Sequence, residues 1–204
     1  MADTECKNGI TEFSNERWLY EESILVGLER PDISLPAVEC YETEIRGAKL
    51  SNATLSRWVF EDCTFVQCDM SNIKLNEVSL QKCQFRDCRL IGIDWRLANP
   101  FNLSVSFDQC QLAYSNFSGL SVNNLIVQSS DCSHVDFTEA TLSGSIFTRC
   151  NLAHALFDKT DLRNADFSSA RQVHFDPRAN TLNDTQVSME DALAIVRLFG
   201  IIPS

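Results

Sequence analysis

The sequence contains little glycine and proline and has no long apolar run. Only seven glycines and five prolines occur in 204 residues, whereas 44% of the residues are hydrophobic. This composition is typical of one ordered domain of ordinary size. No stretch of about 18 apolar residues occurs, so we expect no membrane-spanning helix and no membrane partner. The N-terminal residues show no basic segment followed by an apolar one, and we therefore expect a cytoplasmic protein.

The residue arrangements of enzyme active sites are also missing. The sequence shows no glycine-rich phosphate loop, no nucleophile beside a base and no pair of carboxylates. We therefore expect no enzymatic activity, no catalytic residue and no cofactor.

What the sequence does contain is an apolar residue at every fifth position. Eleven successive centres run from Ile45 to Trp95 and thirteen more from Phe107 to Phe167, all of them apolar. Because this period fits neither a helix, with about 3.6 residues per turn, nor a strand, the chain must turn at every repeat. The residues two before each centre, such as Ala48 and Ala53, are mostly small or apolar, and polar residues lie between. The pattern predicts one side of a square coil per repeat, with the interior filled by side chains.

The nine cysteines follow the same period. An odd count without a secretion signal favours reduced thiols over disulfides. Cys132 is a centre, and six others stand in the column two residues before a centre: Cys63, Cys68, Cys83, Cys88, Cys110 and Cys150. Zinc ligands in a pair usually stand two to four residues apart, whereas Cys63 and Cys68 are five apart and lie on successive sides of the coil. We therefore expect no metal site, and interpret these cysteines as small core residues.

Several five-residue segments share the pattern A/C-(D/N)-(L/F)-X-X, among them CDMSN, VDFTE, TDLRN and ADFSS. Over at least residues 43 to 169, the sequence resembles the pentapeptide-repeat proteins. The resemblance implies an all-β fold, a right-handed quadrilateral β-helix with four pentapeptides per coil and residues twenty apart stacked in ladders. We expect the β-helix to span residues 38–170, as part of a rod of about seven coils.

The N-terminal segment, residues 1–37, is less regular. The register extends backwards through Tyr20, Leu25 and Leu35, and Arg30 violates it. Two interpretations stay open, namely degenerate first coils or an N-terminal cap.

The register breaks once, between Trp95 and Phe107. These centres are twelve residues apart, so two extra residues lie within residues 96–106. A tolerated bulge and a loop that contacts a partner are both compatible with the insertion. The candidate contact residues are Arg96, Leu97, Asn99, Pro100, Phe101 and Asn102.

The C-terminal segment, residues 171–204, is predicted to contain one helix. Ser188 stands three residues before Asp191, as in a capping box with Asp in place of Glu. An apolar stripe follows, formed by Ala192, Ile195, Val196 and Phe199, with Leu193 and Leu198 flanking it. We expect this short C-terminal α-helix to cap the open end of the coil and to form a homodimer, with capping alone as the alternative.

This helix and the following GIIPS narrow the resemblance to the Qnr-type and microcin- and albicidin-immunity branch. The branch implies a protein that binds bacterial DNA gyrase, a type II topoisomerase, and protects it from a topoisomerase poison. That role is one of antibiotic resistance or self-immunity, with topoisomerase IV as a further candidate partner. The alternative is a non-enzymatic pentapeptide-repeat adaptor or scaffold with a different protein partner. Loop contact and acidic mimicry of DNA are both open as mechanisms.

The charge is compatible with a partner that handles DNA. A net charge of −11 suits a basic protein surface and argues against nucleic acid as a direct ligand. If the rod mimics DNA, the sequence predicts an acidic N-terminal part at the tips and, near the dimer centre, an acidic face made of outward carboxylates: Asp108, Asp131, Asp136, Glu139, Asp158, Asp161 and Asp166. Ordinary solvated surface charge is the alternative.

The only histidines, His134, His154 and His174, are spaced twenty residues apart, with Tyr114 twenty before the first. This spacing predicts a ladder of rings on one outer edge. Ring stacking explains such a ladder without a ligand, and whether it has one is left open.

Overall fold

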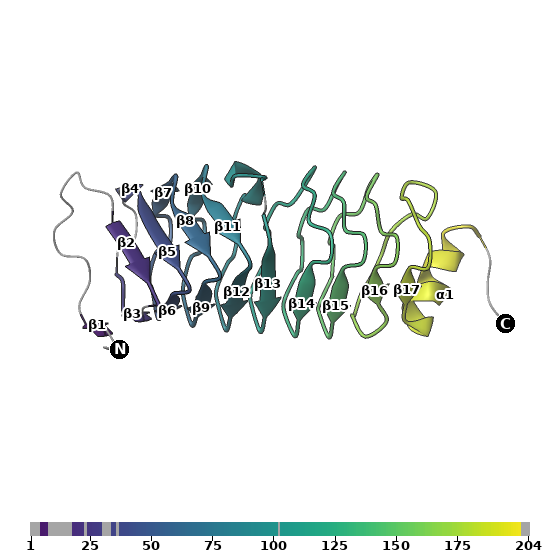
Figure 1. Ribbon diagram of the computed structural model, residues 1–204. Coiled ribbons are helices and arrows are strands. Elements are labelled where there is room, and N and C mark those ends of the chain that lie inside the picture. The colour runs from purple at the N-terminus through teal and green to yellow at the C-terminus, as the bar shows by residue number, and fades with distance from the viewer. Residues whose placement is uncertain are drawn as a thin grey trace.

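The protein is a β-solenoid rod, seen from the side in Figure 1. The computed structural model describes residues 5–7, 18–22, 24–29, 34–35, 37–101 and 103–200. Each coil takes about twenty residues, and parallel strands from successive coils form ladders along the rod. The predicted all-β quadrilateral helix is confirmed.

The four sides of the rod are named here in chain order. The first side is a ten-stranded parallel sheet: β1 (Glu5–Lys7), β3 (Ile24–Val26), β6 (Glu44–Arg46), β9 (Thr64–Val66), β12 (Cys83–Arg86), β13 (Val105–Asp108), β14 (Ile126–Gln128), β15 (Ile146–Thr148), β16 (Asp166–Phe167) and β17 (Gln186–Val187). The second side is a ladder of single bridges from Glu29 to Arg171. The third side holds β4 (Ser34–Leu35), β7 (Thr54–Ser56) and β10 (Lys74–Asn76), and the fourth holds β2 (Trp18–Glu21), β5 (Val38–Tyr41), β8 (Val59–Glu61) and β11 (Ser79–Gln81). Single bridges continue the third and fourth sides towards the C-terminus.

The corners explain the five-residue period. The residue two positions after a centre takes the left-handed conformation, with φ of 57° at Asn52, 59° at Arg57, 52° at Asp62 and 55° at Gln67. These four residues turn the chain at four successive corners. Because a left-handed residue recurs at most corners and is usually not a glycine, the chain bends without a glycine at most corners.

The interior is filled by the two inward columns. Phe117, Phe137 and Phe157 stack with ring centroids 5.4 and 5.3 Å apart, and Phe147 stacks on Phe167 at 4.9 Å. All five rings are buried. The aromatic ladders predicted from twenty-residue spacing are therefore present, and they leave no channel through the coil.

The cysteines combine packing with hydrogen bonding. The eight cysteines whose side chains are described are all buried and free. The thiol of Cys63 donates to the carbonyl of Cys40 in the preceding coil at 3.3 Å, and that of Cys150 donates to the carbonyl of Val127 at 3.3 Å. The hydroxyl of Thr160 occupies the same column and donates to Phe137 in the same way at 2.9 Å. The thiols therefore act as weak donors in positions that Ser and Thr also fill.

The ladders extend towards both ends beyond the predicted span of 38–170. At the N-terminal end, β2, β3 and β4 pair with β5, β6 and β7, so the described residues between 18 and 35 belong to coils. Arg30, which interrupts the sequence register, lies outside the described residues. At the C-terminal end, β17 pairs with β16, so the coil continues to Val187. Ten strands on the first side correspond to more coils than the seven expected.

The helix α1 (Met189–Arg197) closes the C-terminal end of the rod (Figure 1). The hydroxyl of Ser188 accepts from the backbone N–H of Asp191 at 3.1 Å and donates to its carboxylate at 2.7 Å, which is the expected helix cap. Ile195 is buried against the core. Within the described part of the chain, no helix is both long and apolar enough to cross a bilayer.

Candidate functional site

The register break produces a protrusion on the fourth side. The backbone N–H of Asn99 bonds to Val78 in the preceding coil at 2.9 Å, and that of Ser104 bonds to Leu80 at 2.9 Å. Leu103 is buried and takes the place of the missing centre. Three residues, 100–102, are therefore inserted between two residues that keep their places in the ladder.

One corner residue is missing from the same repeat. Val105 pairs directly with Cys83, so a single residue, Ser104, separates the centre Leu103 from the next inward position. In a regular repeat, two residues stand there, the second with positive φ, as in Gln81 and Lys82. Three added residues and one lost residue account for the two extra residues in the sequence.

The protrusion and the turn that precedes it present apolar side chains to solvent. Phe101 is 79% exposed and Leu97 is 43% exposed. Leu97 belongs to the 3-10 turn η1 (Trp95–Leu97), and its carbonyl accepts from the backbone N–H of Glu77 at 2.8 Å. Trp95, the first residue of this turn, is buried and stacks on Phe117 with centroids 5.2 Å apart. Exposed apolar side chains thus stand on a rigid base.

The other predicted loop residues differ in their settings. Arg96 forms a salt bridge with Asp94 at 2.8 Å, and its hydrogen bonds lower the pKa of that carboxyl. The side-chain oxygen of Asn99 accepts from the backbone N–H of Phe101 at 3.0 Å. Asn102 lies outside the described residues. Pro100 and Phe101 belong to the protrusion itself, and Arg96 is held against the third side.

The predicted acidic face is not one face, and this expectation from the sequence is wrong. The seven carboxylates occupy all four sides: Asp108 and Asp166 the first, Asp131 the second, Asp136 and Asp158 the third, Asp161 the fourth, and Glu139 the corner between the third and fourth. The physical reason is that residues of different coils share a side only when their spacing is close to a multiple of twenty, and most pairs in this set do not meet that condition.

Some of these carboxylates are also engaged locally. Asp161 pairs with Arg163 at 2.6 Å, and hydrogen bonds from Arg163 lower its pKa. Glu139 pairs with Lys159 at 3.2 Å. Asp131 accepts from the side-chain amide of Asn151 at 2.9 Å. These partners reduce the negative potential that the set presents.

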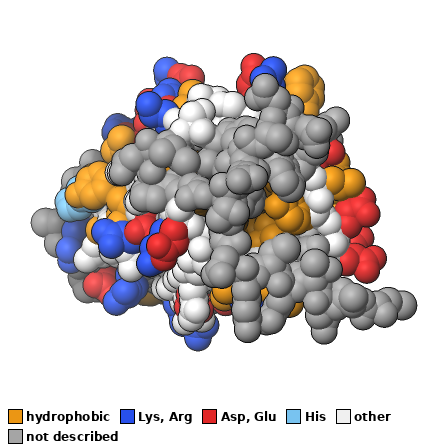
Figure 2. All heavy atoms as spheres, turned by 90° about the vertical axis from the view of Figure 1, so that its left-hand side faces the viewer, with side chains coloured by type: hydrophobic (Ala, Val, Ile, Leu, Met, Phe, Trp, Pro, Cys, Tyr) orange, Lys and Arg blue, Asp and Glu red, His pale blue; other side chains and the backbone are white. Residues whose placement is uncertain are grey.

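A denser acidic column lies near the N-terminal end, within the acidic N-terminal part expected at the tips, but its residues were not named from the sequence. Glu22, Glu42 and Asp62 stand above one another at the corner between the fourth and first sides, each with positive φ. Lys82 ends the column and pairs with Asp62 at 3.1 Å. Figure 2, which looks onto the N-terminal end, shows acidic side chains gathered along one edge. The twenty-residue spacing of these carboxylates was the signal that could have identified them.

The helix residues predicted to form a dimer divide into two groups. Ala192, Ile195 and Val196 line a cavity of about 360 Å³ against the last coil. Phe199 lies 5.1 Å from the guanidinium of Arg178. Ala192, Ile195 and Val196 therefore face the last coil of their own chain, whereas Phe199 is 43% exposed.

The apolar side chains that α1 presents to solvent lie elsewhere. Met189 is 77% exposed, and Leu193, one turn later, is also exposed. Leu193 flanks the predicted stripe, whereas Met189 was not part of it, although both are apolar and spaced for one helix face.

The aromatic ladder is shorter than predicted. Tyr114 stacks on His134 at 4.7 Å, and His134 stacks on His154 at 4.8 Å. His174 does not join this ladder. Tyr114, His134 and His154 all have positive φ, whereas in the next coil Gln172, two residues before His174, takes the left-handed conformation instead. Among the described residues, no group of three or more His, Cys, Asp or Glu side chains could hold a metal ion.

The coil, its five-residue corners and its inward Leu and Phe columns define a pentapeptide-repeat β-solenoid. Two family models agree, one described as a pentapeptide repeat region, over residues 43–100, and one as pentapeptide repeats (8 copies), over residues 130–171. The chain is a pentapeptide-repeat protein.

Among solved structures, two trypsin-treated forms of QnrB1, a plasmid-mediated fluoroquinolone resistance protein, share the fold. One has a TM-score of 0.67 at 22% sequence identity, covering 96% of this chain and 96% of that chain. The other has a TM-score of 0.66 at 20% identity, covering 89% of this chain and 99% of that chain. No curated protein matches the sequence significantly.

Proposed function

We propose that this protein binds bacterial DNA gyrase in the cytoplasm and protects it from a topoisomerase poison, without catalysing a reaction. The observation that carries the proposal is the likeness to QnrB1, a fluoroquinolone resistance protein, along 96% of both chains, from the N-terminal coils to the C-terminal helix. Fluoroquinolones are accordingly the first poisons to test. Topoisomerase IV is a second candidate partner.

The protrusion of residues 100–102 is the proposed contact. Binding determinants are often found on loops that a rigid scaffold positions. Here Phe101 is largely exposed, while the hydrogen bonds of Asn99 and Ser104 hold both ends of the protrusion. An exposed aromatic ring on a fixed base has the character of an interface anchor.

Negative charge supplies the second proposed contribution. The net charge of −11 favours association with a basic surface through long-range attraction. Carboxylates lie on all four sides, and the column of Glu22, Glu42 and Asp62 adds a local concentration near one end. Acidic mimicry of DNA would therefore use the circumference and the tip of the rod.

Dimerisation through the C-terminal helix is also proposed. Met189 and Leu193 leave an apolar strip on the outside of α1, next to the end of the rod. Two copies related by a two-fold axis would bury this strip against itself and give a rod of twice the length.

A supercoiling assay tests the proposal. Purified gyrase is assayed with a panel of poisons, fluoroquinolones included, in the presence and absence of the protein, and binding of the protein to gyrase is measured separately. We expect restored supercoiling with at least one poison and direct binding to gyrase. Absence of both would reject the proposal in favour of an adaptor or scaffold for another protein.

A further inference from the structure

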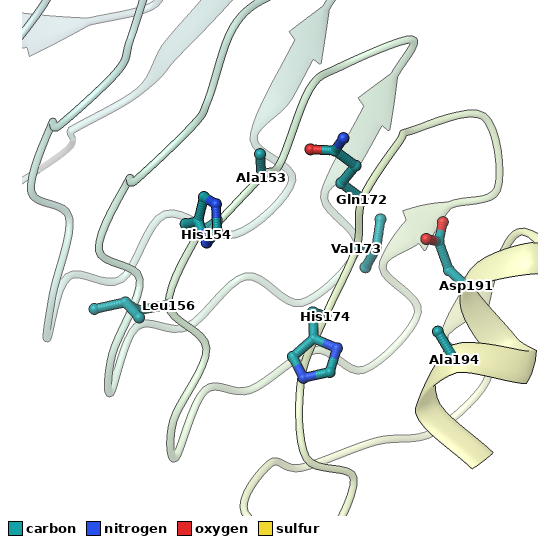
Figure 3. A pocket seen from close by; sticks show the side chains of 9 residues that line it. Ala153, His154, Leu156, Gln172, Val173, His174, Asp191 and Ala194 are labelled. Atoms are coloured by element: carbon teal, nitrogen blue, oxygen red, sulfur yellow. The ribbon is translucent and has the colours of Figure 1, made fainter. Parts of the chain in front are cut away.

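A cavity of about 670 Å³ lies between the last coils and the C-terminal helix, on the outside of the solenoid. Figure 3 shows the side chains around it, which come from three elements. His154 and Leu156 belong to one coil, Gln172, Val173 and His174 to the next, and Ala194 to α1. The volume falls within the range of about 300 to 1,000 Å³ that is usual for small-molecule sites.

The cavity lies at the end of the aromatic ladder. One face of the His154 ring is covered by His134, at a centroid distance of 4.8 Å and an interplanar angle of 21°. The next rung along the rod would be His174. No ring contact joins His174 to His154 in the described chain, because the corner at Gln172 has displaced it. The face of the His154 ring that points towards the C-terminal end of the rod is thus directed towards the cavity. The ring that a regular repeat would stack on this face is missing.

The remaining walls suit a flat apolar molecule with a polar edge. Leu156 is 55% exposed, an unusual setting for a large apolar side chain on an outward position, and Ala194 adds apolar surface. Gln172 and His174 supply hydrogen-bonding groups at the rim (Figure 3). The Asp191 carboxylate, which also lines the cavity, is already bonded to the Ser188 hydroxyl at 2.7 Å.

We propose that this cavity binds a small planar aromatic molecule, which stacks on His154 as the fourth ring of the ladder formed by Tyr114, His134 and His154. Offset stacking at the rung spacing of this ladder is a favourable arrangement for aromatic rings. Leu156 and Ala194 flank the inserted ring, and Gln172 and His174 pair with its polar substituents. The site does not depend on gyrase protection, since neither the protrusion nor the acidic column contributes to it.

Proton NMR of the imidazoles tests the proposal on the full-length protein. The chain has three histidines, so single substitutions assign their ring signals. Naphthol serves as the aromatic probe and decahydronaphthol, its saturated counterpart, as the control. We expect naphthol to cause a saturable upfield shift that is largest for His154, because a stacked ring shields the protons beneath it. Decahydronaphthol should cause none.

Two substitutions at the platform make the test specific. His154→Ala is expected to weaken naphthol binding about tenfold, whereas His154→Phe, which keeps an aromatic face, should bind as the unmodified protein does. Ala194→Trp, which fills the cavity from the helix side, should abolish the shift. Unchanged melting temperatures verify the fold of each variant, since all three changes are at the surface. Equal affinity of His154→Ala and the unmodified protein, or an equal response to decahydronaphthol, would overturn the proposal.

Discussion

The backbone N–H of Asn99 donates to the carbonyl of Val78 at 2.9 Å, so the ladder of the fourth side is intact up to the residue before the protrusion. The ladder resumes at Ser104, whose N–H bonds to Leu80 at 2.9 Å. The protrusion therefore lies between two residues that keep their ladder hydrogen bonds, and we expect that it can be removed without opening the coil if the missing corner residue is supplied.

The first prediction uses this anchoring. Deleting residues 100–102 and adding a glycine after Ser104 converts the repeat into Ala-Asn-Leu-Ser-Gly, which matches the pentapeptide pattern and restores a ten-residue distance between Trp95 and Phe107. We expect the melting temperature to stay the same or rise, because the corner residue is replaced and a glycine tolerates positive φ. Protection of gyrase from a poison should fall by about tenfold or more in the supercoiling assay.

A point substitution controls for the change in backbone. Phe101→Ser alters an exposed side chain only and should change stability by less than about 0.5 kcal/mol. If both variants fold and both protect gyrase fully, the protrusion is not a contact.

The second prediction concerns the thiols. Burial raises the pKa of the Cys40, Cys63 and Cys83 thiols above the ordinary value, so these groups stay protonated and unreactive at neutral pH. With Cys6 replaced by serine, we expect no rapid reaction with a thiol reagent in the native protein, because the other eight thiols are buried, and eight reactive thiols in denaturant. A rapidly modified thiol in the native Cys6→Ser variant would contradict the assigned inward column.

The same thiols make stability depend on alkaline pH. Because their pKa is higher in the folded chain than in the unfolded chain, they contribute stability that is fully present below about pH 8.5 and is lost as the pH rises further. Denaturant titrations at neutral and alkaline pH should show this loss. Replacing Cys63 and Cys83 by serine, which can still donate to the preceding coil, should reduce the loss.

How far the sequence predicts the fold follows from the five-residue period. Each centre from Ile45 onward is enclosed by neighbouring coils, so only an apolar residue fits, and the pattern is visible without a structure. The two extra residues could be located for the same reason. The backbone conformation around the insertion could not be predicted. Whether Leu103 or Pro100 takes the position of the centre depends on backbone hydrogen bonds to the preceding coil.

The errors in the candidate site have separate causes. The position of each carboxylate within the twenty-residue coil, and hence its side of the rod, could be read from the sequence. Grouping Asp108 with Asp161 ignored that these two residues lie on different sides. The helix stripe of Ala192, Ile195 and Val196 was predicted correctly as apolar, but periodicity does not tell whether a stripe packs on its own coil or on a second copy. His174 left the ladder because of a corner change at Gln172, which has no clear sequence signal.

The third prediction distinguishes the two roles of the helix. Met189→Glu combined with Leu193→Glu changes the exposed strip and should yield a folded monomer, because two carboxylates per copy would meet their equivalents across a two-fold axis. Light scattering measures the mass. A dimer of unchanged mass would reject this strip as the dimer interface.

Ile195→Asp is the matched change on the inner face. Ile195 is buried at 7% exposure, so a carboxylate there should destabilise the C-terminal coils by about 3 kcal/mol or more. Thermal unfolding should report this loss, while the outer variant should melt close to the unmodified protein.

The fourth prediction locates the electrostatic contribution. Glu22→Gln combined with Glu42→Gln removes two charges from the N-terminal acidic column and should weaken gyrase binding about threefold to tenfold at low salt. The residual affinity should depend less on ionic strength. Surface plasmon resonance over a salt series measures both quantities.

The control removes the same number of charges elsewhere. Asp108→Asn combined with Asp166→Asn changes two carboxylates on the first side, at a distance from the column. An equal loss of affinity in the two variants would indicate that net charge, and not the column, governs association.

The regular corners of the solenoid also determine the distance between features along the rod. A whole coil contacts only its neighbours, and one coil advances the rod by about 4.8 Å. Between the protrusion and α1, the chain can therefore be lengthened or shortened only in steps of one coil if every outward residue is to keep its side. The number of twenty-residue coils between the protrusion and α1 therefore sets their separation along the rod, and it also fixes their relative orientation about the rod axis.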